Sequence, residues 1–233
     1  MLKKALLALA LFIAVFIITA VIRFPYISML SSMAGKLSTE KKIDVSWERS
    51  TGSFPSIKLS SVRIVSEENE VAVFDSIDMF LSLSGMTFRG SQGAGRVSGK
   101  IARQKLDYTI SSLPIPAFLS TSLGKGTLNA SGTYDIKTGK GKGKFDASIE
   151  QFPNPLISGA LTIDGQDTIE PRKTGIVFNL KGASLTGKGT VTITSADAST
   201  PSQVQGVLEV KVGQMPLIFN IQGTLNNIAV TKA

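Results

Sequence analysis

The chain has 233 residues and a formal net charge of +8 at pH 7, and it contains no cysteine and no histidine. This composition excludes thiol nucleophiles, disulfides, imidazole general bases and the commonest metal ligands. Lysines alternate with glycines, as in residues 139–144, rather than gathering with aromatic residues. We therefore predict a solvated lysine run on a hairpin or an edge strand and no nucleic-acid partner, with attraction to anionic lipid headgroups as the alternative.

The first predicted element is a transmembrane helix over residues 5–22, an uncharged apolar stretch that follows Lys3 and Lys4 and precedes Arg23. A helix of this length spans about 27 Å, close to the hydrocarbon thickness of a bilayer. A cleaved secretory signal is the alternative, although its apolar core is shorter and a small-x-small cleavage site follows it. The predicted anchor side chains are Leu6, Leu7, Leu9, Leu11, Phe12, Ile13, Val15, Phe16, Ile17, Ile18, Val21 and Ile22.

The basic flank predicts the orientation of this anchor. Positive residues favour the cytoplasmic side, so residues 1–4 are expected to form a cytoplasmic tip and the bulk of the chain to lie across the membrane. Residues 23–41 follow as a juxtamembrane segment, in which Ile27, Leu30, Met33, Ala34 and Leu37 recur at helical spacing. This spacing predicts a short helix that either lies on the membrane or caps the end of a sheet.

From residue 42 the apolar period changes to two, which predicts strands. Strands are expected at 43–47, at 57–64 with a bulge at Ser60 and Ser61, near 71–73, at 77–83, near 101 and at 106–110. We expect residues 85–99 to form a glycine-rich connection. Two prolines within 113–116 predict a crossing loop over 113–123, which could subdivide the β domain of residues 42–233.

The carboxy-terminal part carries a degenerate Gly-x-aliphatic repeat without a fixed period. Six of its glycines are predicted to mark the points where strands begin, namely Gly126, Gly143, Gly159, Gly189, Gly206 and Gly223. The strands between them alternate apolar and polar residues, as in antiparallel sheets with one dry face. The candidate apolar face comprises Ile176, Phe178, Leu180, Leu208, Val210, Val212, Leu217, Phe219 and Ile221.

The predicted fold is therefore mostly β: one transmembrane helix and a short helix, then a curved, largely antiparallel, glycine-punctuated sheet. Such a sheet forms a sandwich, a groove or a collapsed barrel, and its apolar face is covered by the sheet itself, by a partner or by lipid chains.

Catalytic residues are not predicted. Asp164 and Asp167, like Asp75 and Asp78, are short-spaced carboxylate pairs that we interpret as solvated turn or strand-edge residues. No nucleophile elbow or phosphate loop has the context that its chemistry requires. We therefore expect no enzymatic activity, no metal site and no cofactor.

The order of features resembles a known family. It runs from the anchor through Phe24-Pro25-Tyr26, the strand with Trp47, the turn at residues 52–55 and the segment 57–62 to the glycine hairpins that end at 221–225. This layout resembles the N component of type II secretion systems, which is similar to the wider AsmA-like group of envelope proteins.

The resemblance implies a single-pass protein of the bacterial inner membrane, with a cytoplasmic N-terminus and a periplasmic β domain. Its implied function is that of an accessory secretion component, which acts without catalysis by contacting other inner-membrane components of the apparatus. The AsmA-like kinship implies an alternative function, a lipid-binding or lipid-transfer module that holds phospholipid on the apolar face of its sheet.

Overall fold

The computed structural model describes residues 26–41, 43–66, 69–82, 84–115, 124–150, 159–195, 202–224 and 227–233. Within these residues one helix precedes a series of strands that all belong to one antiparallel sheet, and this sheet is not closed. The elements are α2 (Tyr26–Lys41), β1 (Ile43–Ser46), β2 (Arg49–Ser53), β3 (Ser56–Ser66), β4 (Asn69–Ser82), β5 (Gly85–Gln92), β6 (Gly95–Ala102), β7 (Lys105–Pro114), β8 (Gly126–Asp135), β9 (Lys140–Ile149), β10 (Leu161–Glu170), β11 (Lys173–Gly182), β12 (Leu185–Thr194), β13 (Gln203–Val212), β14 (Met215–Thr224) and β15 (Asn227–Lys232).

The mostly β composition and the short helix are confirmed. No helix in the described part of the chain has the length and apolarity needed to span a bilayer. The predicted anchor at 5–22, with its side chains from Leu6 to Ile22, lies outside the described residues, as do residues 1–4 and 23–25.

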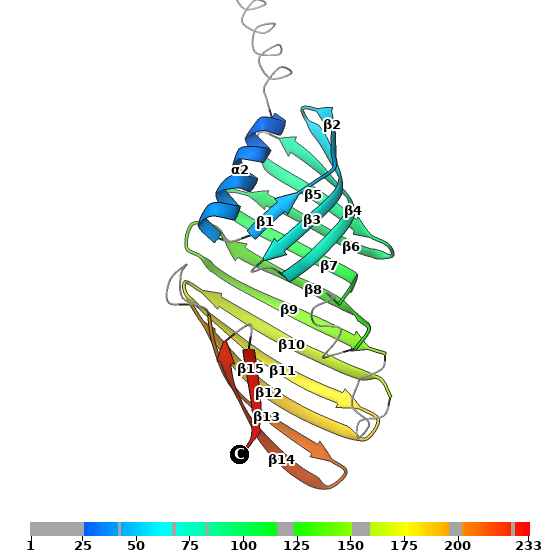
Figure 1. The fold of residues 1–233 in the computed structure, drawn as a ribbon, viewed down its shortest axis with the longest axis vertical. Helices are drawn as coiled ribbons and strands as arrows, with labels where there is room; N and C mark the ends of the chain where they lie inside the picture. The colour runs from blue at the N-terminus through cyan, green and yellow to red at the C-terminus, as the bar shows by residue number, and fades with distance from the viewer. Residues whose placement is uncertain are drawn as a thin grey trace, which may run out of the picture.

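The strands follow one another in the sheet in chain order from β3 to β15, while β1 and β2 both pair with β3 (Figure 1). β7 pairs with β8 across the proline-containing segment, so the sheet continues there and is not divided into two halves. Pro114 is the last residue of β7, and residues 116–123 lie outside the described ranges.

Two strand predictions were wrong. The apolar runs near 71–73 and 77–83 belong to one strand, β4, because Phe74 continues the buried series between them. The glycine-rich stretch 85–99 is not a connection but the hairpin of β5 and β6. At the predicted bulge the backbone is irregular: Ser61 has φ +53°, and Leu59 and Val62 on either side of it are both buried. The register between β3 and β4 does not shift there, however, but between Ile64 and Val65.

Antiparallel register assigns alternate residues of each strand to one side of the sheet. We call the apolar face the side of β5–β14 that carries Phe145 and Phe178, and the polar face the opposite side. The large apolar side chains of the apolar face include Met86, Phe88, Val97, Ile101, Leu106, Ile110, Leu113, Leu128, Phe145, Ile149, Leu161, Ile163, Ile169, Ile176, Phe178, Leu180, Leu185, Val191, Ile193, Val204, Leu208, Val210, Val212, Met215, Leu217, Phe219 and Ile221. The nine residues predicted from β11, β13 and β14 all lie on it.

Aromatic rings on the apolar face lie over glycines of the neighbouring strand. Phe88 faces Gly99, Phe145 faces Gly165, and Phe178 faces Gly189, each as a direct cross-strand pair. A Cβ atom added at Gly165 would lie 2.6 Å from Cζ of Phe145, so the ring occupies the space that any other residue would need. This packing explains why a strand of the sheet can contain glycine without loss of order.

The prediction that the six repeat glycines mark strand starts holds only in part. Gly126 begins β8, and Gly159 precedes β10 with φ +97°. For Gly143, Gly189 and Gly206 the prediction was wrong, because these three lie in the interiors of β9, β12 and β13 on the apolar face. Gly223 is the penultimate residue of β14, with φ +141°.

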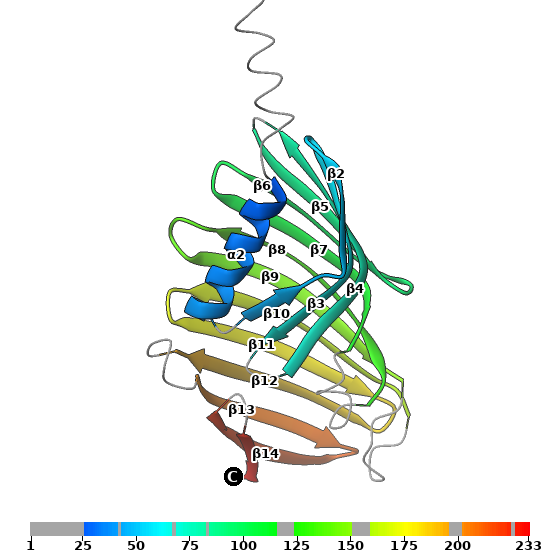
Figure 2. The same ribbon diagram turned by 45° about the horizontal axis from the view of Figure 1, so that its top comes forward.

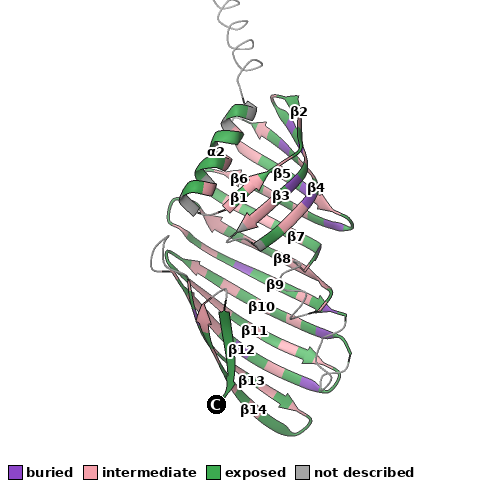
Figure 3. Ribbon diagram, in the orientation of Figure 1, coloured by how far each residue is buried: buried purple, intermediate pink, exposed green. Residues whose placement is uncertain are grey.

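Buried side chains gather in two places rather than along the whole sheet (Figure 3). The first cluster contains Ile57, Leu59, Val62, Phe74, Met79 and Leu113, against which Leu30 of α2 packs, and there β1–β4 cross over the strands that follow (Figures 1 and 2). The second cluster contains Ile149, Leu161 and Leu185, at one end of β9, β10 and β12. Over β11–β14 the described residues provide no second layer, and most apolar side chains of this face are half-buried there, although Leu185 and Val204 are buried.

Candidate functional site

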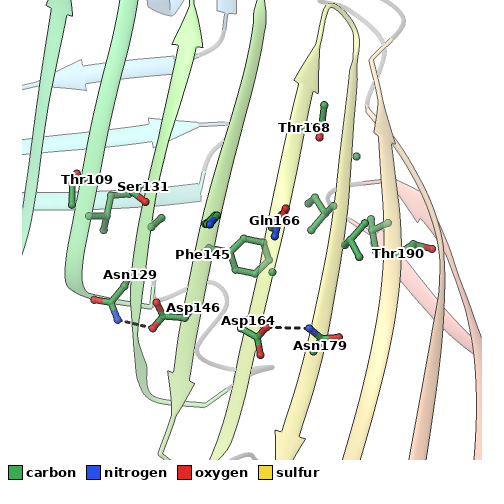
Figure 4. A pocket seen from close by; sticks show the side chains of 18 of the residues that line it. Thr109, Asn129, Ser131, Phe145, Asp146, Asp164, Gln166, Thr168, Asn179 and Thr190 are labelled. Carbon is green, nitrogen blue, oxygen red and sulfur yellow. Dashed lines mark hydrogen bonds between the residues drawn. The ribbon is translucent and has the colours of Figure 1, made fainter.

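The polar face is hollowed across β7–β12, where a shallow cavity of about 990 Å³ is lined by hydroxyl, amide and carboxylate groups together with apolar side chains such as Val177 (Figure 4). The labelled lining residues include Thr109, Asn129, Ser131, Asp146, Asp164, Gln166, Thr168, Asn179 and Thr190. These side chains point to this face because they alternate with the apolar residues of the same strands.

A row of paired polar side chains crosses this hollow. Asn129 donates its amide N–H to Asp146 at 2.8 Å, and Asn179 donates to Asp164 at 3.0 Å. Asp146 and Asp164 are themselves direct cross-strand partners. The two amides therefore satisfy carboxylates that would otherwise repel each other across the ladder.

The polar row has few of the groups that would support catalysis or metal binding. Its carboxylates are exposed and already accept amide hydrogen bonds. Among the described residues, no group of three or more His, Cys, Asp or Glu side chains is placed to hold a metal ion. The row can offer hydrogen bonds to a polar ligand, and its charge is that of two adjacent carboxylates with neutral amide partners.

The predicted lysine run lies in β9, with Lys140, Lys142 and Lys144 exposed on the polar face. β9 follows a hairpin turn, as predicted, but it is a central strand that pairs with both β8 and β10. The edge-strand alternative was therefore wrong.

The two predicted carboxylate pairs do not converge. Asp164 and Asp167 lie within β10 rather than in a turn, and their spacing of three places them on opposite faces of the sheet. Asp75 and Asp78 lie within β4, where Asp75 accepts a hydrogen bond of 2.8 Å from the backbone N–H of Gly93. The interpretation of both pairs as turn residues was wrong, because each interrupts an apolar alternation that continues beyond it.

Asp167 instead lies on the apolar face, beside the hydroxyl group of Tyr108. Tyr108 is opposite Gly132, and Asp167 is opposite Gly143. A Cβ atom placed at Gly143 would lie 2.5 Å from Oδ1 of Asp167 and 2.8 Å from the hydroxyl oxygen of Tyr108. The two oxygens therefore approach the same point above the glycine.

The surroundings of this pair favour an uncharged tyrosine. Burial, and after it the nearby carboxylate of Asp167, raise the pKa of the Tyr108 hydroxyl above its ordinary value. In the described residues of β5–β14, Asp167 carries the one charged side chain on the apolar face. The alternation Ile163, Gly165, Asp167, Ile169 was the signal in the sequence that could have placed it there.

Comparisons of the chain with protein-family models, with curated proteins and with solved structures found no match. The fold is one open antiparallel sheet, and the two candidate sites are the polar hollow and the apolar face with its single carboxylate.

Proposed function

We propose that the apolar face binds the acyl chains of phospholipids, and that the protein is a lipid-binding or lipid-transfer module of the bacterial envelope. The observation that carries this proposal is the continuous apolar face over β5–β14. On β11–β14 most of its apolar side chains are half-buried, and the described residues provide no second layer over them. A sheet face of this kind is usually covered, and large uncovered apolar surfaces serve as sites of interaction.

The dimensions and the energetics suit a lipid chain. Ten neighbouring strands spaced about 4.8 Å apart extend roughly 40 Å, more than the hydrocarbon thickness of a whole bilayer of about 30 Å. Each methylene group that leaves water for an apolar surface contributes about 0.8 kcal/mol. Contact along half of an acyl chain would therefore offset the entropy lost when the chain is immobilised.

The sequence supports a location of the protein at the bacterial inner membrane. The apolar stretch at 5–22 would tether the sheet to the inner membrane, and the layout resembles envelope proteins with lipid-handling relatives. In this arrangement the sheet lies next to its source of phospholipid, and binding requires no catalysis.

The test is site-specific photo-crosslinking of the full chain in cell membranes. A benzophenone amino acid replaces Phe219 on the apolar face, and the matched control replaces Asn220, its neighbour on the polar face. We expect covalent phospholipid adducts, identified by mass spectrometry, at position 219 and not at position 220. Equal adduct yields at both positions, or none at position 219, would overturn the proposal.

A second pair of variants tests whether the apolar character itself is needed. With the crosslinker at 219, Phe178→Asp should reduce the yield of adducts severalfold because it places a charge in the apolar face. Val177→Asp adds the same carboxylate to the polar face, at a position that is 60% exposed, and should leave the yield unchanged. A Phe178→Asp yield equal to that of the control would contradict lipid binding on this face.

The second candidate function is the one that the family resemblance implies, an accessory component of a type II secretion system. The outer edge of β15 favours it: among the described strands β15 pairs with β14 alone, all six of its residues are exposed, and Val230 is 56% exposed. Unpaired strand edges accept strands from partner chains. Crosslinkers at Val230 should then capture inner-membrane components of the secretion apparatus, and deletion of the protein should reduce export; failure of both results would exclude this role.

A further inference from the structure

We infer that Asp167 and Tyr108 form a recognition point on the apolar face for an amphiphile with a primary amine headgroup, such as phosphatidylethanolamine. The inference rests on the proposed binding of acyl chains and adds the class of headgroup. Its starting point is one carboxylate on a face that is otherwise apolar or uncharged over ten strands. A ligand that complements this face has an apolar body and a single positive group.

The carboxylate has no cation beside it on the same face. The lysines nearest to it in register, Lys142 and Lys144, flank Gly143 on β9, and their side chains lie on the polar face. The polar group beside Asp167 on this face is the hydroxyl of Tyr108, which is uncharged. The charge of Asp167 is therefore uncompensated on the apolar face within the described residues.

Asp167 lies toward one margin of the apolar face, away from the buried cluster of Ile149, Leu161 and Leu185. It is six residues along β10 from Leu161, which corresponds to about 20 Å. Between them lie Ile163 and Gly165, the latter covered by the ring of Phe145. Beyond Asp167 the same face continues with Ile169 and, further along that row of the sheet, with Ile193 and Val204. Asp167 is therefore one charged point within an apolar face, and it fixes the position at which the headgroup of an amphiphile would lie.

The chemistry of the pair selects an ammonium group that carries N–H donors. A half-buried carboxylate forms charge-assisted hydrogen bonds with an ammonium group, and these bonds are stronger than neutral ones. A choline headgroup has the same charge but no N–H to donate, and an anionic headgroup is repelled. The protonated hydroxyl of Tyr108 can donate to the phosphate oxygen that stands next to the amine in such a lipid.

The test compares two lipids that differ only in the headgroup. Full-length protein with the crosslinker at Phe219 is mixed with detergent micelles containing equal amounts of phosphatidylethanolamine and phosphatidylcholine with identical acyl chains. The ratio of the two adducts is then measured by mass spectrometry. Asp167→Asn removes the charge from the apolar face, Asp164→Asn removes one from the polar face of the same strand, and Asp167→Glu restores a carboxylate.

We expect the original protein and its Asp164→Asn variant to favour phosphatidylethanolamine about five- to tenfold. Asp167→Asn should bring the ratio to about one, and Asp167→Glu should retain most of the preference. Three results would overturn the inference while leaving acyl-chain binding in place. The adducts show no preference between the two lipids, Asp167→Asn leaves the preference intact, or Asp164→Asn also abolishes it. Absence of adducts with either lipid would overturn both proposals.

Discussion

Substitution of Gly165 by alanine tests whether glycine on the apolar face is required by aromatic packing. The new Cβ atom would lie 2.5 Å from the backbone oxygen of Val177 and 2.6 Å from Cζ of Phe145. The first contact cannot relax without disturbing the ladder between β10 and β11, and the second requires the ring to move. Both movements lower the stability of the folded state.

The magnitude follows from overpacking. Extra atoms in a well-packed region cost about 1–3 kcal/mol, and Gly165 belongs at the upper end because both a backbone atom and a ring atom must shift. Alanine also stabilises by about 0.4–1 kcal/mol through the unfolded chain. We therefore expect Gly165→Ala to lower the free energy of unfolding by about 2 kcal/mol.

The matched control is Gly175→Ala on the adjacent strand β11. A Cβ atom at Gly175 meets nothing within 4 Å, and this residue lies on the polar face. Its substitution should be neutral or stabilising by up to about 1 kcal/mol.

The assay is urea unfolding of the full chain in detergent, followed by far-ultraviolet circular dichroism. Because the m value should not change, the difference appears in the denaturation midpoint. The double variant Phe145→Ala with Gly165→Ala should lose less stability than the sum of the two single variants, since removing the ring relieves one of the two close contacts. Equal midpoints for the Gly165 and Gly175 variants would refute the packing argument.

Three further predictions follow from burial and electrostatics. Ile149→Ala, at a fully buried position, should lower the free energy of unfolding by about 2–5 kcal/mol in the same assay. Absorbance titration should show a pKa of the Tyr108 hydroxyl above 10.0, chiefly because of burial. Asp167→Asn should lower this pKa in part, because it removes the neighbouring negative charge. The stability that protonated Tyr108 contributes should be lost as the pH rises past the ordinary pKa of tyrosine. The pKa of Asp135 should be below 3.8, because the backbone N–H of Thr138 donates a hydrogen bond to its carboxylate. Carbon-13 chemical shifts of the Asp135 carboxyl group, followed against pH, would measure this pKa. The stability from the hydrogen bond should be lost as the pH falls through the lowered pKa. An unshifted tyrosine, an unshifted aspartate or an Ile149 variant of unchanged stability would each contradict its prediction.

Sequence periodicity determined the class of fold and the helix. The alternation in Ile176, Phe178 and Leu180 predicts one dry face because side chains in a strand alternate strictly between the two sides. The spacing of apolar residues within 26–37 predicts α2, because residues three and four apart lie on the same face of a helix. These are local relations, and the sequence contains them in full.

The predictions for three glycines within strands were wrong. In the sequence glycine marks a turn or the start of a strand, and Gly143, Gly189 and Gly206 were assigned accordingly. In the structure a glycine such as Gly189 lies in the middle of a strand because the ring of Phe178 on the next strand covers it. The reason lies in cross-strand register, which no local pattern contains.

The sequence by itself determined that alternate residues of each strand are apolar, and that no residue type suited to thiol or imidazole chemistry is present. Only the tertiary structure decided that the strands join in chain order into one open sheet rather than two facing sheets. It also decided that Asp167 meets Tyr108 from a strand nearly sixty residues earlier. Such contacts depend on which strands become neighbours, because side-chain packing between strands sums over partners that are distant along the chain.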